Sequence, residues 1–581
     1  MNLHSYRLLF LLIGIFLISL PLSGCDNTDA EPVVIVEAVK PTAQAMVAAA
    51  NPYAVKAGLQ VLRDGGTAVD AAVAVQSVLG LVEPQSSGIG GGAFMLVYDA
   101  ATGDLRSFDG RETAPAGASA YMFLGDDGKS LGYVDAVNSG HAVGVPGAMA
   151  MLGIAQKKYG KLSWSELFNP AIELAETGFE VSPRLAQLLE AYANRVNLGN
   201  NPAAKAYFFL ADGTTLPQGF LRKNPDYANS LTLLANNPRA LLEGELAIKI
   251  IAAIANDPRP GSLSLDDLAS YQPRERDAVC RPYRELQICG APPPSSGGHA
   301  INSTMGILSH FKFSKDGAND PNNWHLFIEA QRLAYADRDK FIADDSFVAV
   351  PLEGLLDAKY LMERAKLIAT DKAMKHAKAG NPGGVAYGRD NTAESEGTTH
   401  FSIIDQWGNA VAMTTTVESI FGNKRFVGGF LLNNQLTDFA RNPVDAMGKP
   451  LANAPAPGKR PRSSMSPTIV LGGAGKPMLL TGSPGGNSII AYTAKTLVGI
   501  LDWGLTPQQA VGLPNVVARG DVTRIGAMNL DPALVPALTE MGHVIRATAG
   551  ENSGLHVIQI MPDGSLLGGA DPRREGQARQ P

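Results

Sequence analysis

The chain has few cysteines and no excess of positive charge. Its 581 residues include 3 cysteines, 49 Lys+Arg and 55 Asp+Glu, which gives a formal net charge of −6. Proteins that bind nucleic acid usually carry a basic excess, so this class is not indicated. Charged residues make up 18% and hydrophobic residues 45%, which excludes a disordered chain and predicts a large buried core.

The motifs of nucleotide and metal sites are also missing. Gly88–Ala93 loosely matches a dinucleotide-binding loop, but a strand-like sequence follows it in place of the required helix. Gly473–Lys476 lacks the spacing and the hydroxyl residue of a P-loop. The 9 histidines form no metal-binding motif. We therefore predict no cofactor and no metal.

A single long apolar stretch, Leu8–Leu20, lies near the N-terminus and is too short to span a bilayer comfortably. The sequence Leu22-Ser23-Gly24-Cys25 after it resembles a bacterial lipobox. We predict a signal peptide over residues 1–24, a lipid on Cys25 and a polar tether over 25–35; the alternative is an ordinary secretory signal with an incidental cysteine. The expected location is the periplasm or cell envelope, with membrane contact through the lipid only.

The two remaining cysteines, Cys280 and Cys289, lie nine positions apart in the sequence. In an oxidising compartment this pair could form one local disulfide. A metal site is a weaker interpretation, because the nearest histidine, His299, is not at a finger-like spacing.

Helices and strands are mixed along the chain. Asn51-Pro52 predicts the start of a helix that Gly65-Gly66 ends, and Thr67 caps a second helix running toward Leu81. Further expected elements are a helix at 324–343 and strands at 93–98, 401–404, 410–416, 467–471 and 478–481. Without a steady βαβ alternation, this order favours an α+β fold of packed layers.

A loop-like segment runs directly into one of these strands. Residues 380–397 have the composition of an exposed loop, and Thr398 follows them. If the strands pair across 406–409 with Asp405 opposite Ala410, Thr399 faces Thr416, which places a second hydroxyl beside Thr398. Glu418 could point to the same face. The alternative is that the threonines only reflect β-propensity.

Several short segments of the chain form a set in a fixed order. They are Pro84–Gly92, Asp109–Glu112, Val145–Gly147, Pro292–Gly298, Gly397–His400, Leu432–Gln435, Arg462–Thr468 and Gly482–Gly486. Together they resemble the γ-glutamyltransferases, or γ-glutamyltranspeptidases, a family of N-terminal-nucleophile hydrolases. The resemblance covers nearly all of the mature chain.

The resemblance implies a four-layer αββα sandwich made as an inactive precursor. The precursor would cut itself between Gly397 and Thr398 into a large subunit (36–397) and a small subunit (398–581) that stay together in one fold. Thr398 would then be the nucleophile. Its new α-amino group, with an ordinary pKa of about 7.7–8.0, would be the base.

The resemblance also implies a role for each residue of the site. Thr416 would hydrogen-bond the nucleophile, and the N–H groups of Gly485 and Gly486 would form the oxyanion hole. The donor α-carboxylate would be held by Arg111, as a two-pronged fork, with Ser463 and Ser464, and the α-ammonium by Glu418, Gln435 and Asp438. The stretch between Asp438 and Ser463 lacks the lid tyrosine of some bacterial members, which leaves acceptor handling open.

The function expected from this resemblance is γ-glutamyl hydrolysis and transfer. Glutathione and other γ-glutamyl compounds would be donors, and water, amino acids or peptides would be acceptors. The alternatives are a cephalosporin (glutaryl-type) acylase of the same fold and a catalytically inactive envelope binding protein.

The lipobox-like sequence generates the first prediction. Cells expressing the protein should incorporate labelled palmitate into it through Cys25, and the Cys25→Ala variant should not be labelled. Gel autoradiography of the purified proteins measures this. Labelling that persists in Cys25→Ala would contradict the anchor.

Overall fold

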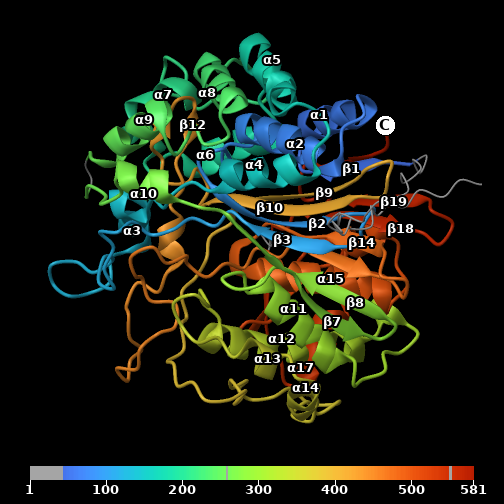
Figure 1. Cartoon of the computed structure of the whole chain (residues 1–581). Coiled ribbons are helices and arrows are strands. Elements are labelled where there is room, and N and C mark those ends of the chain that lie inside the picture. Colours follow the sequence, from blue (N-terminus) through green and yellow to red (C-terminus); the bar gives the residue numbers. More distant parts are fainter. Residues whose placement is uncertain (1–43, 257–258, 549–551) are drawn as a thin grey trace, which may run out of the picture. The chain divides into compact units, whose positions relative to one another are not determined.

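The computed structural model describes residues 44–256, 259–548 and 552–581. The predicted signal peptide, the lipidation site Cys25 and the tether lie outside the described residues. Within them, two β-sheets face each other and a layer of helices covers the outer face of each sheet (Figure 1). The four-layer αββα sandwich that the sequence predicted is confirmed. In this described part, no helix is both long and apolar enough to cross a membrane.

The first sheet has seven strands and carries the predicted nucleophile. Its strand order is β20 (Gln577–Arg579), β1 (Met46–Ala49), β9 (Gly397–Ile404), β10 (Ala410–Glu418), β2 (Gly92–Tyr98), β3 (Leu105–Asp109) and β6 (Arg274–Asp277). Every pair of neighbouring strands in it is antiparallel.

The second sheet has six strands. Its order is β19 (Leu566–Ala570), β18 (His556–Ile560), β14 (Pro477–Thr481), β13 (Thr468–Leu471), β8 (Leu286–Gly290) and β7 (Val279–Tyr283). Cys280 and Cys289 face each other across β7 and β8 and are joined by a disulfide. Smaller strands outside the two sheets are β4 (Phe179–Glu180), β5 (Leu221–Arg222), β11 (Phe426–Val427), β12 (Phe430–Leu431), β15 (Val516–Val517), β16 (Val522–Gly526) and β17 (Val544–Thr548).

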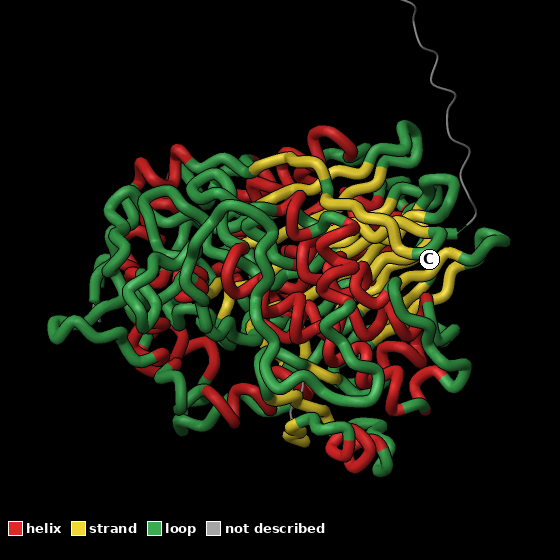
Figure 2. Tube along the Cα trace, turned by 90° about the horizontal axis from the view of Figure 1, so that it is seen from below, coloured by secondary structure: helices red, strands yellow, loops and turns green. Residues whose placement is uncertain are grey.

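Helices cover both outer faces (Figure 1), and the view from below in Figure 2 looks onto the helices and loops on one of them. On the first-sheet side lie α1 (Pro52–Arg63), α2 (Ala68–Val82), α4 (Ala148–Tyr159), α5 (Asn169–Thr177), α6 (Pro183–Tyr192), α7 (Pro202–Phe208), α8 (Pro225–Asn236) and α9 (Gly244–Ile254). On the second-sheet side lie α11 (Gly297–Leu308), α12 (Pro321–Phe341), α14 (Ala358–Ala365), α15 (Ile489–Leu501), α16 (Pro507–Gly512) and α17 (Leu534–Glu540). The short helices α3 (Tyr133–Asn138), α10 (Leu265–Ser270) and α13 (Leu352–Leu355) complete the set.

The first two helices begin where the sequence predicted. The Asn51 side chain accepts a hydrogen bond from Tyr53 N, with Pro52 at the first helical position. Thr67 and Asp70 form a reciprocal capping box at the start of α2, which is buried along its whole length.

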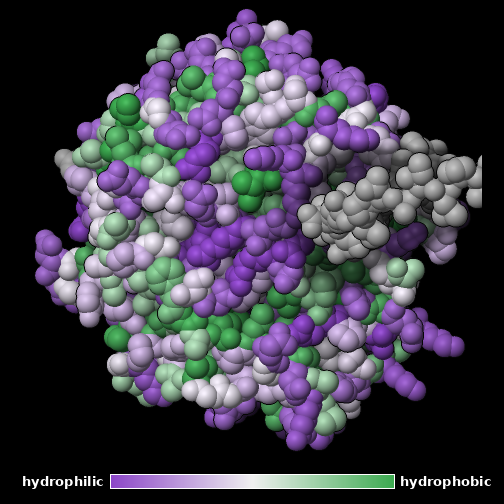
Figure 3. All heavy atoms as spheres, in the orientation of Figure 1, coloured by the Kyte–Doolittle hydropathy of each residue, from purple (hydrophilic) through white to green (hydrophobic). Residues whose placement is uncertain are grey.

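The outer surface is mostly hydrophilic on the face shown in Figure 3, with scattered apolar patches.

Alternation along β9 and β10 decides which side chains face the second sheet. Phe401 and Ile403 pack in the core under the helices, whereas Ile404 and Ala412 pack in the core between the sheets. Because successive side chains of a strand point to opposite faces, even-numbered residues of both strands face the second sheet. Thr398 and Thr416 therefore share the inner face of the sandwich.

The pairing of β9 with β10 differs by one residue from the predicted register. Ile404, and not Asp405, lies opposite Ala410, so Thr416 faces Thr398 directly and Thr399 faces Thr415. The reason is the connecting loop, which has five residues because Asp405 belongs to it. The Asp405 carboxylate accepts hydrogen bonds from the N–H groups of Trp407 and Asn409, both 2.9 Å, and so folds the loop on itself.

Candidate active site

Three oxygens are linked by hydrogen bonds at the start of β9. Thr398 Oγ1 lies 3.1 Å from Thr416 Oγ1, and Thr416 Oγ1 donates to the carbonyl oxygen of Gly397 at 2.6 Å. Thr416 Oγ1 also accepts from Glu418 N at 2.9 Å. A hydroxyl has one proton to donate and two lone pairs. Because the Thr416 hydroxyl uses its proton in the hydrogen bond to Gly397 O, the Thr398 hydroxyl must be the donor to Thr416.

The residue before Thr398 has to be glycine. A Cβ on Gly397 would lie 2.6 Å from Glu418 O and closer still to Ser419 O. Both oxygens are backbone atoms beside a bulge between Thr416 and Glu418, so displacing them would distort the paired strands. Gly397 is also the centre of a tight turn in which Thr398 N donates to Glu396 O at 3.0 Å. The peptide bond between Gly397 and Thr398 is thus held in one position.

Two glycines lie at the start of the 3-10 helix Gly486–Ser488, before α15. Gly485 has φ of 131° and Gly486 has φ of 54°, both in the region that favours glycine. A Cβ on Gly486 would lie 2.8 Å from the carbonyl carbon of Ser395 and closer to the carbonyl oxygens of Glu394 and Ser395. Only a residue without a side chain can therefore lie this close to the segment that precedes Thr398.

Arg111 is buried and already bound. Its Nη2 pairs with Asp438 Oδ2 at 2.6 Å and donates to Arg462 O at 2.7 Å, and its Nε donates to Pro461 O at 3.1 Å. Its Nη1 makes no hydrogen bond within the described part of the chain. A fork from Nη1 and Nη2 to a donor carboxylate is not offered by this geometry, because the Arg462 carbonyl and Asp438 already use Nη2. Nη1, which lies 3.9 Å from Glu112 Oε2, is the group that can receive a ligand.

The acidic side of the site consists of two buried carboxyl groups. Gln435 Nε2 donates to Asp438 Oδ2 at 2.7 Å. Burial raises the pKa of Asp438 well above its usual range, although the neighbouring Arg111 charge opposes the shift. Burial also raises the pKa of Glu418, whose carboxylate accepts from Ser395 N at 2.9 Å and from the Asn434 amide. A positively charged ligand group would restore the ionised form of both.

The serine pair lies between these charges. Ser464 N donates to Glu394 Oε2 at 2.8 Å, and Arg338 Nη2 donates to Ser464 Oγ at 2.6 Å. Ser463 N donates to Pro294 O at 2.9 Å, while its Oγ accepts from Met465 N at 3.1 Å. Nine of the ten predicted catalytic and substrate-binding residues line one small cavity. The tenth, Gly485, directly precedes Gly486, which lines it.

The chain itself fills the site. The remaining cavity is only about 10 Å³, and it is lined by Arg111, Glu394, Ser395, Thr398, Thr416, Glu418, Gln435, Asp438, Ser463, Ser464, Met465, Gly486 and Ile489. The segment 380–397 is an irregular loop, as its composition predicted, and residues 381–386 are largely exposed. Its last part, however, enters the site, and Asp390 upstream is buried against Arg462, 2.8 Å away. The expectation of exposure fails for these residues because their polar groups have buried partners.

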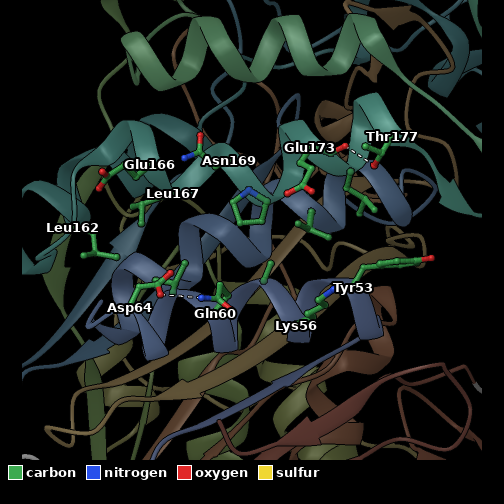
Figure 4. A pocket seen from close by; sticks show the side chains of 15 residues that line it. Tyr53, Lys56, Gln60, Asp64, Leu162, Glu166, Leu167, Asn169, Glu173 and Thr177 are labelled. Carbon is green, nitrogen blue, oxygen red and sulfur yellow. Dashed lines mark hydrogen bonds between the residues drawn. The ribbon is translucent and has the colours of Figure 1, made fainter.

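A much larger hollow, of about 860 Å³, lies elsewhere, between α1, α2 and α5 on the outer helix layer. Lys56, Asp64, Glu166 and Glu173 point into or flank it (Figure 4). None of the predicted catalytic residues lines it. Size alone therefore does not identify the reactive site of this protein.

Among the residues that sequence reasoning missed, three reach the site from distant elements. Tyr133, on α3, donates its hydroxyl to Glu418 Oε2 at 3.3 Å. Arg574 Nη1 donates to Thr398 O at 2.9 Å and fixes the carbonyl side of Thr398. Arg338, on α12, bonds Glu394 and Ser464. These residues come from distant parts of the chain, and no local spacing signals them.

The αββα sandwich, with a threonine at the start of a central strand and a second hydroxyl against it, defines the class of N-terminal-nucleophile hydrolases. The family model described as Gamma-glutamyltranspeptidase matches residues 54–580. The chain belongs to this family of enzymes.

Relatives and solved structures agree with this assignment. The chain is 37% identical to the glutathione hydrolase proenzyme of Bacillus subtilis strain 168 (92% of this chain, 91% of the relative). It is 34% identical to the acylase ACY 1 proenzyme of Pseudomonas sp. strain SE83 (91% and 92%). A cephalosporin acylase from Bacillus halodurans superposes with a TM-score of 0.81 at 27% identity (95% and 98%). The γ-glutamyltranspeptidase of Helicobacter pylori gives 0.53 at 33% identity (56% and 91%).

The hydroxyl of Thr416 generates the second prediction. Thr416→Val keeps the shape but removes the donor to Gly397 O, and losing one such donor typically costs about 100- to 1,000-fold in rate. The purified variant should therefore stay largely full length on denaturing gels.

Thr415→Val is the matched control. Thr415 lies on the same strand but on the opposite face, and its buried Oγ1 has no hydrogen-bond partner among the described residues. Its variant should be processed like the wild type. Equal processing of all three proteins would remove Thr416 from the reaction.

Proposed function

We propose that this enzyme transfers the γ-glutamyl group of glutathione and related compounds to water, amino acids or peptides, through an ester on Thr398. The observation that carries the proposal is the hydrogen-bonded chain from Thr398 Oγ1 through Thr416 Oγ1 to Gly397 O. Similarity to glutathione hydrolase proenzymes supports the substrate class. The intact hydroxyl pair argues against an inactive envelope binding protein.

Maturation by self-cleavage is the first step of the proposal. Thr398 Oγ attacks the Gly397 carbonyl carbon, and the C–N bond to Thr398 breaks as its nitrogen takes the proton that the Thr398 hydroxyl gives up. The Thr416 hydroxyl, already 2.6 Å from Gly397 O, stabilises the charge that develops on that oxygen. Water hydrolyses the resulting ester, which leaves a carboxylate on Gly397 and a free amino group on Thr398.

The mature site then uses the new amino group. It accepts the Thr398 hydroxyl proton as Oγ attacks the γ-carbonyl of the donor, and returns a proton to the leaving amine. The N–H groups of Gly485 and Gly486 stabilise the oxyanion, since no side chain separates them from it. Water or an amine acceptor then attacks the γ-glutamyl ester and regenerates Thr398.

Opposite charges select the donor. Arg111 Nη1, Ser463 and Ser464 receive the α-carboxylate, and Glu418, Gln435 and Asp438 receive the α-ammonium. In the uncut chain Arg111 and Asp438 lie 2.6 Å apart. A zwitterionic donor places its carboxylate against Arg111 and its ammonium against the acidic groups, so it adds no net charge to the pocket.

A glutaryl-specific acylase is the second candidate, favoured by the cephalosporin acylase that superposes on this chain. A glutaryl group has a carboxylate but no α-ammonium. Binding it would leave the carboxylates of Glu418 and Asp438 beside an apolar methylene, which disfavours that substrate.

Sequencing tests the maturation step. The purified protein should give two bands, about residues 25–397 and 398–581, and Edman degradation of the smaller should read Thr-Thr-His-Phe. Thr398→Ala should stay full length, because it lacks the attacking oxygen. A small chain with another N-terminus would remove Thr398 from the mechanism.

Substrate preference tests donor selection. Asp438→Asn should lower kcat/KM for a γ-glutamyl anilide by roughly 30- to 4,000-fold, as expected when one member of a buried charge pair is lost. Turnover of the glutaryl anilide should be spared or improved, because Asp438 has no partner on that substrate. The second substrate is the internal control for folding. An equal loss on both substrates would place Asp438 in support of the fold or the nucleophile.

A further inference from the structure

Glu394 belongs to the segment before Thr398 that fills the site, and several groups of the protein hold it. Its side chain is 5% exposed and pairs with Arg338 Nη2, while its second oxygen accepts from Ser464 N at 2.8 Å. Its own N–H donates to Asn487 Oδ1 at 2.7 Å. Burial alone would raise the pKa of Glu394, but the charges of Arg338 and Arg462 outweigh it and lower the pKa.

The next residue touches the opposite side of the pocket. Ser395 N donates to Glu418 Oε1 at 2.9 Å. Glu394 thus presents a carboxylate to Ser464, and Ser395 presents an N–H to Glu418. In the proposed function these two groups receive the carboxylate and the ammonium of a donor. The uncut chain occupies both ends of its own donor site.

Glu394 supplies one of three carboxylates among the guanidinium groups around Arg338. Asp339 is shared by Arg338 at 3.0 Å, Arg519 at 3.1 Å and Arg389 at 3.5 Å, and Asp390 pairs with Arg462 at 2.8 Å. Without Glu394, these four guanidinium groups face two carboxylates. Arg338 is fully buried, so the excess positive charge would be poorly screened by water and would attract a carboxylate.

We propose that Arg338 anchors Glu394 so that the uncut chain docks its own cleavage segment in the donor site, which positions the Gly397–Thr398 bond and keeps donors out until cleavage. Glu394 and Arg338 are positioning residues in self-cleavage. Once cut, the segment becomes a ligand that competes for the site it left. This inference rests on the proposed function, because that function defines which residues form the donor site.

The anchor acts on the reaction through distance. Gly397 lies three residues from Glu394, and its carbonyl must stay on Thr416 Oγ1 for attack. A displacement of about 1 Å at a reacting group can cost about 100-fold in rate. Releasing Glu394 frees the segment at its upstream end, so the carbonyl is held less of the time.

The first experiment follows conversion of newly made full-length chain on denaturing gels. Glu394→Gln keeps the size but loses the charge, and its conversion should be slower by about tenfold or more. Glu396→Gln is the matched control, because it removes the same charge from the same segment, two residues nearer the bond. The proposal expects the larger effect at Glu394; conversion of Glu394→Gln at the wild-type rate would overturn it.

The second experiment measures binding to the cleaved wild-type protein by isothermal titration calorimetry. The probes are a peptide of the sequence Gly388–Gly397 and its forms with Gln at position 394 or at position 396. The form with Gln at 394 should bind about 30-fold more weakly or worse, as for loss of a buried charge pair. The segment ending at Gly397 in the cleaved protein competes with all three peptides and lowers their apparent affinities by the same factor. The ratio of these affinities is therefore the quantity to compare.

Equal affinity of the three peptides would overturn the proposal. Excess glutathione should reduce binding of the parent peptide if the two share one site; in an enzyme that turns over γ-glutamyl donors, peptide binding unaffected by glutathione would also overturn the proposal. The conversion rates and the ratio of peptide affinities do not depend on γ-glutamyl turnover. An enzyme that cuts itself but does not use γ-glutamyl donors would therefore refute the proposed function separately.

Discussion

The hydrogen bond from Thr416 to the Gly397 carbonyl is the interaction around which the rest of the site is arranged. It depends on β9 and β10 pairing so that Thr398 and Thr416 are directly opposite and face inward. A slip of one residue would turn Thr398 toward the helix layer. The Asp405 loop at one end and the bulge before Glu418 at the other fix this register. The glycine at position 397 then lets the backbone of Glu418 and Ser419 lie close beside it, where a Cβ would collide with their carbonyl oxygens.

Local signals in the sequence predicted much of the fold and the identity of the site, but not its geometry. The caps at Asn51 and Thr67 and the strands around Thr398 could be read from neighbouring residues. The register could not, because it depends on whether the Asp405 side chain closes the loop. Arg338 and Arg574 reach the site from distant elements, so only the tertiary structure reveals them. The composition of 380–397 predicted an exposed loop, which holds for its first part; composition does not show that Asp390 and Glu394 pair with buried arginines.

Arg111 and Asp438 were expected at opposite ends of a bound zwitterion, yet they contact each other. This is physically reasonable in a site that water cannot fill. Two opposite charges left apart in a buried pocket would each pay a desolvation cost without compensation. The raised pKa of Asp438 shows that even this pair does not fully offset its burial. In the proposed function, a zwitterionic donor would supply a further partner to each of these groups.

Cleavage after Gly397 would leave two chains that share both sheets. In the first sheet, β1 from the upstream part lies between β20 and β9 from the downstream part, and β10 pairs with β2. In the second sheet, β8 pairs with β13. Separating the chains would expose these strand edges and the apolar faces beneath them. The short segment before Thr398 is held through polar contacts of Glu394 and Ser395, so it could leave if its bond to Thr398 were cut.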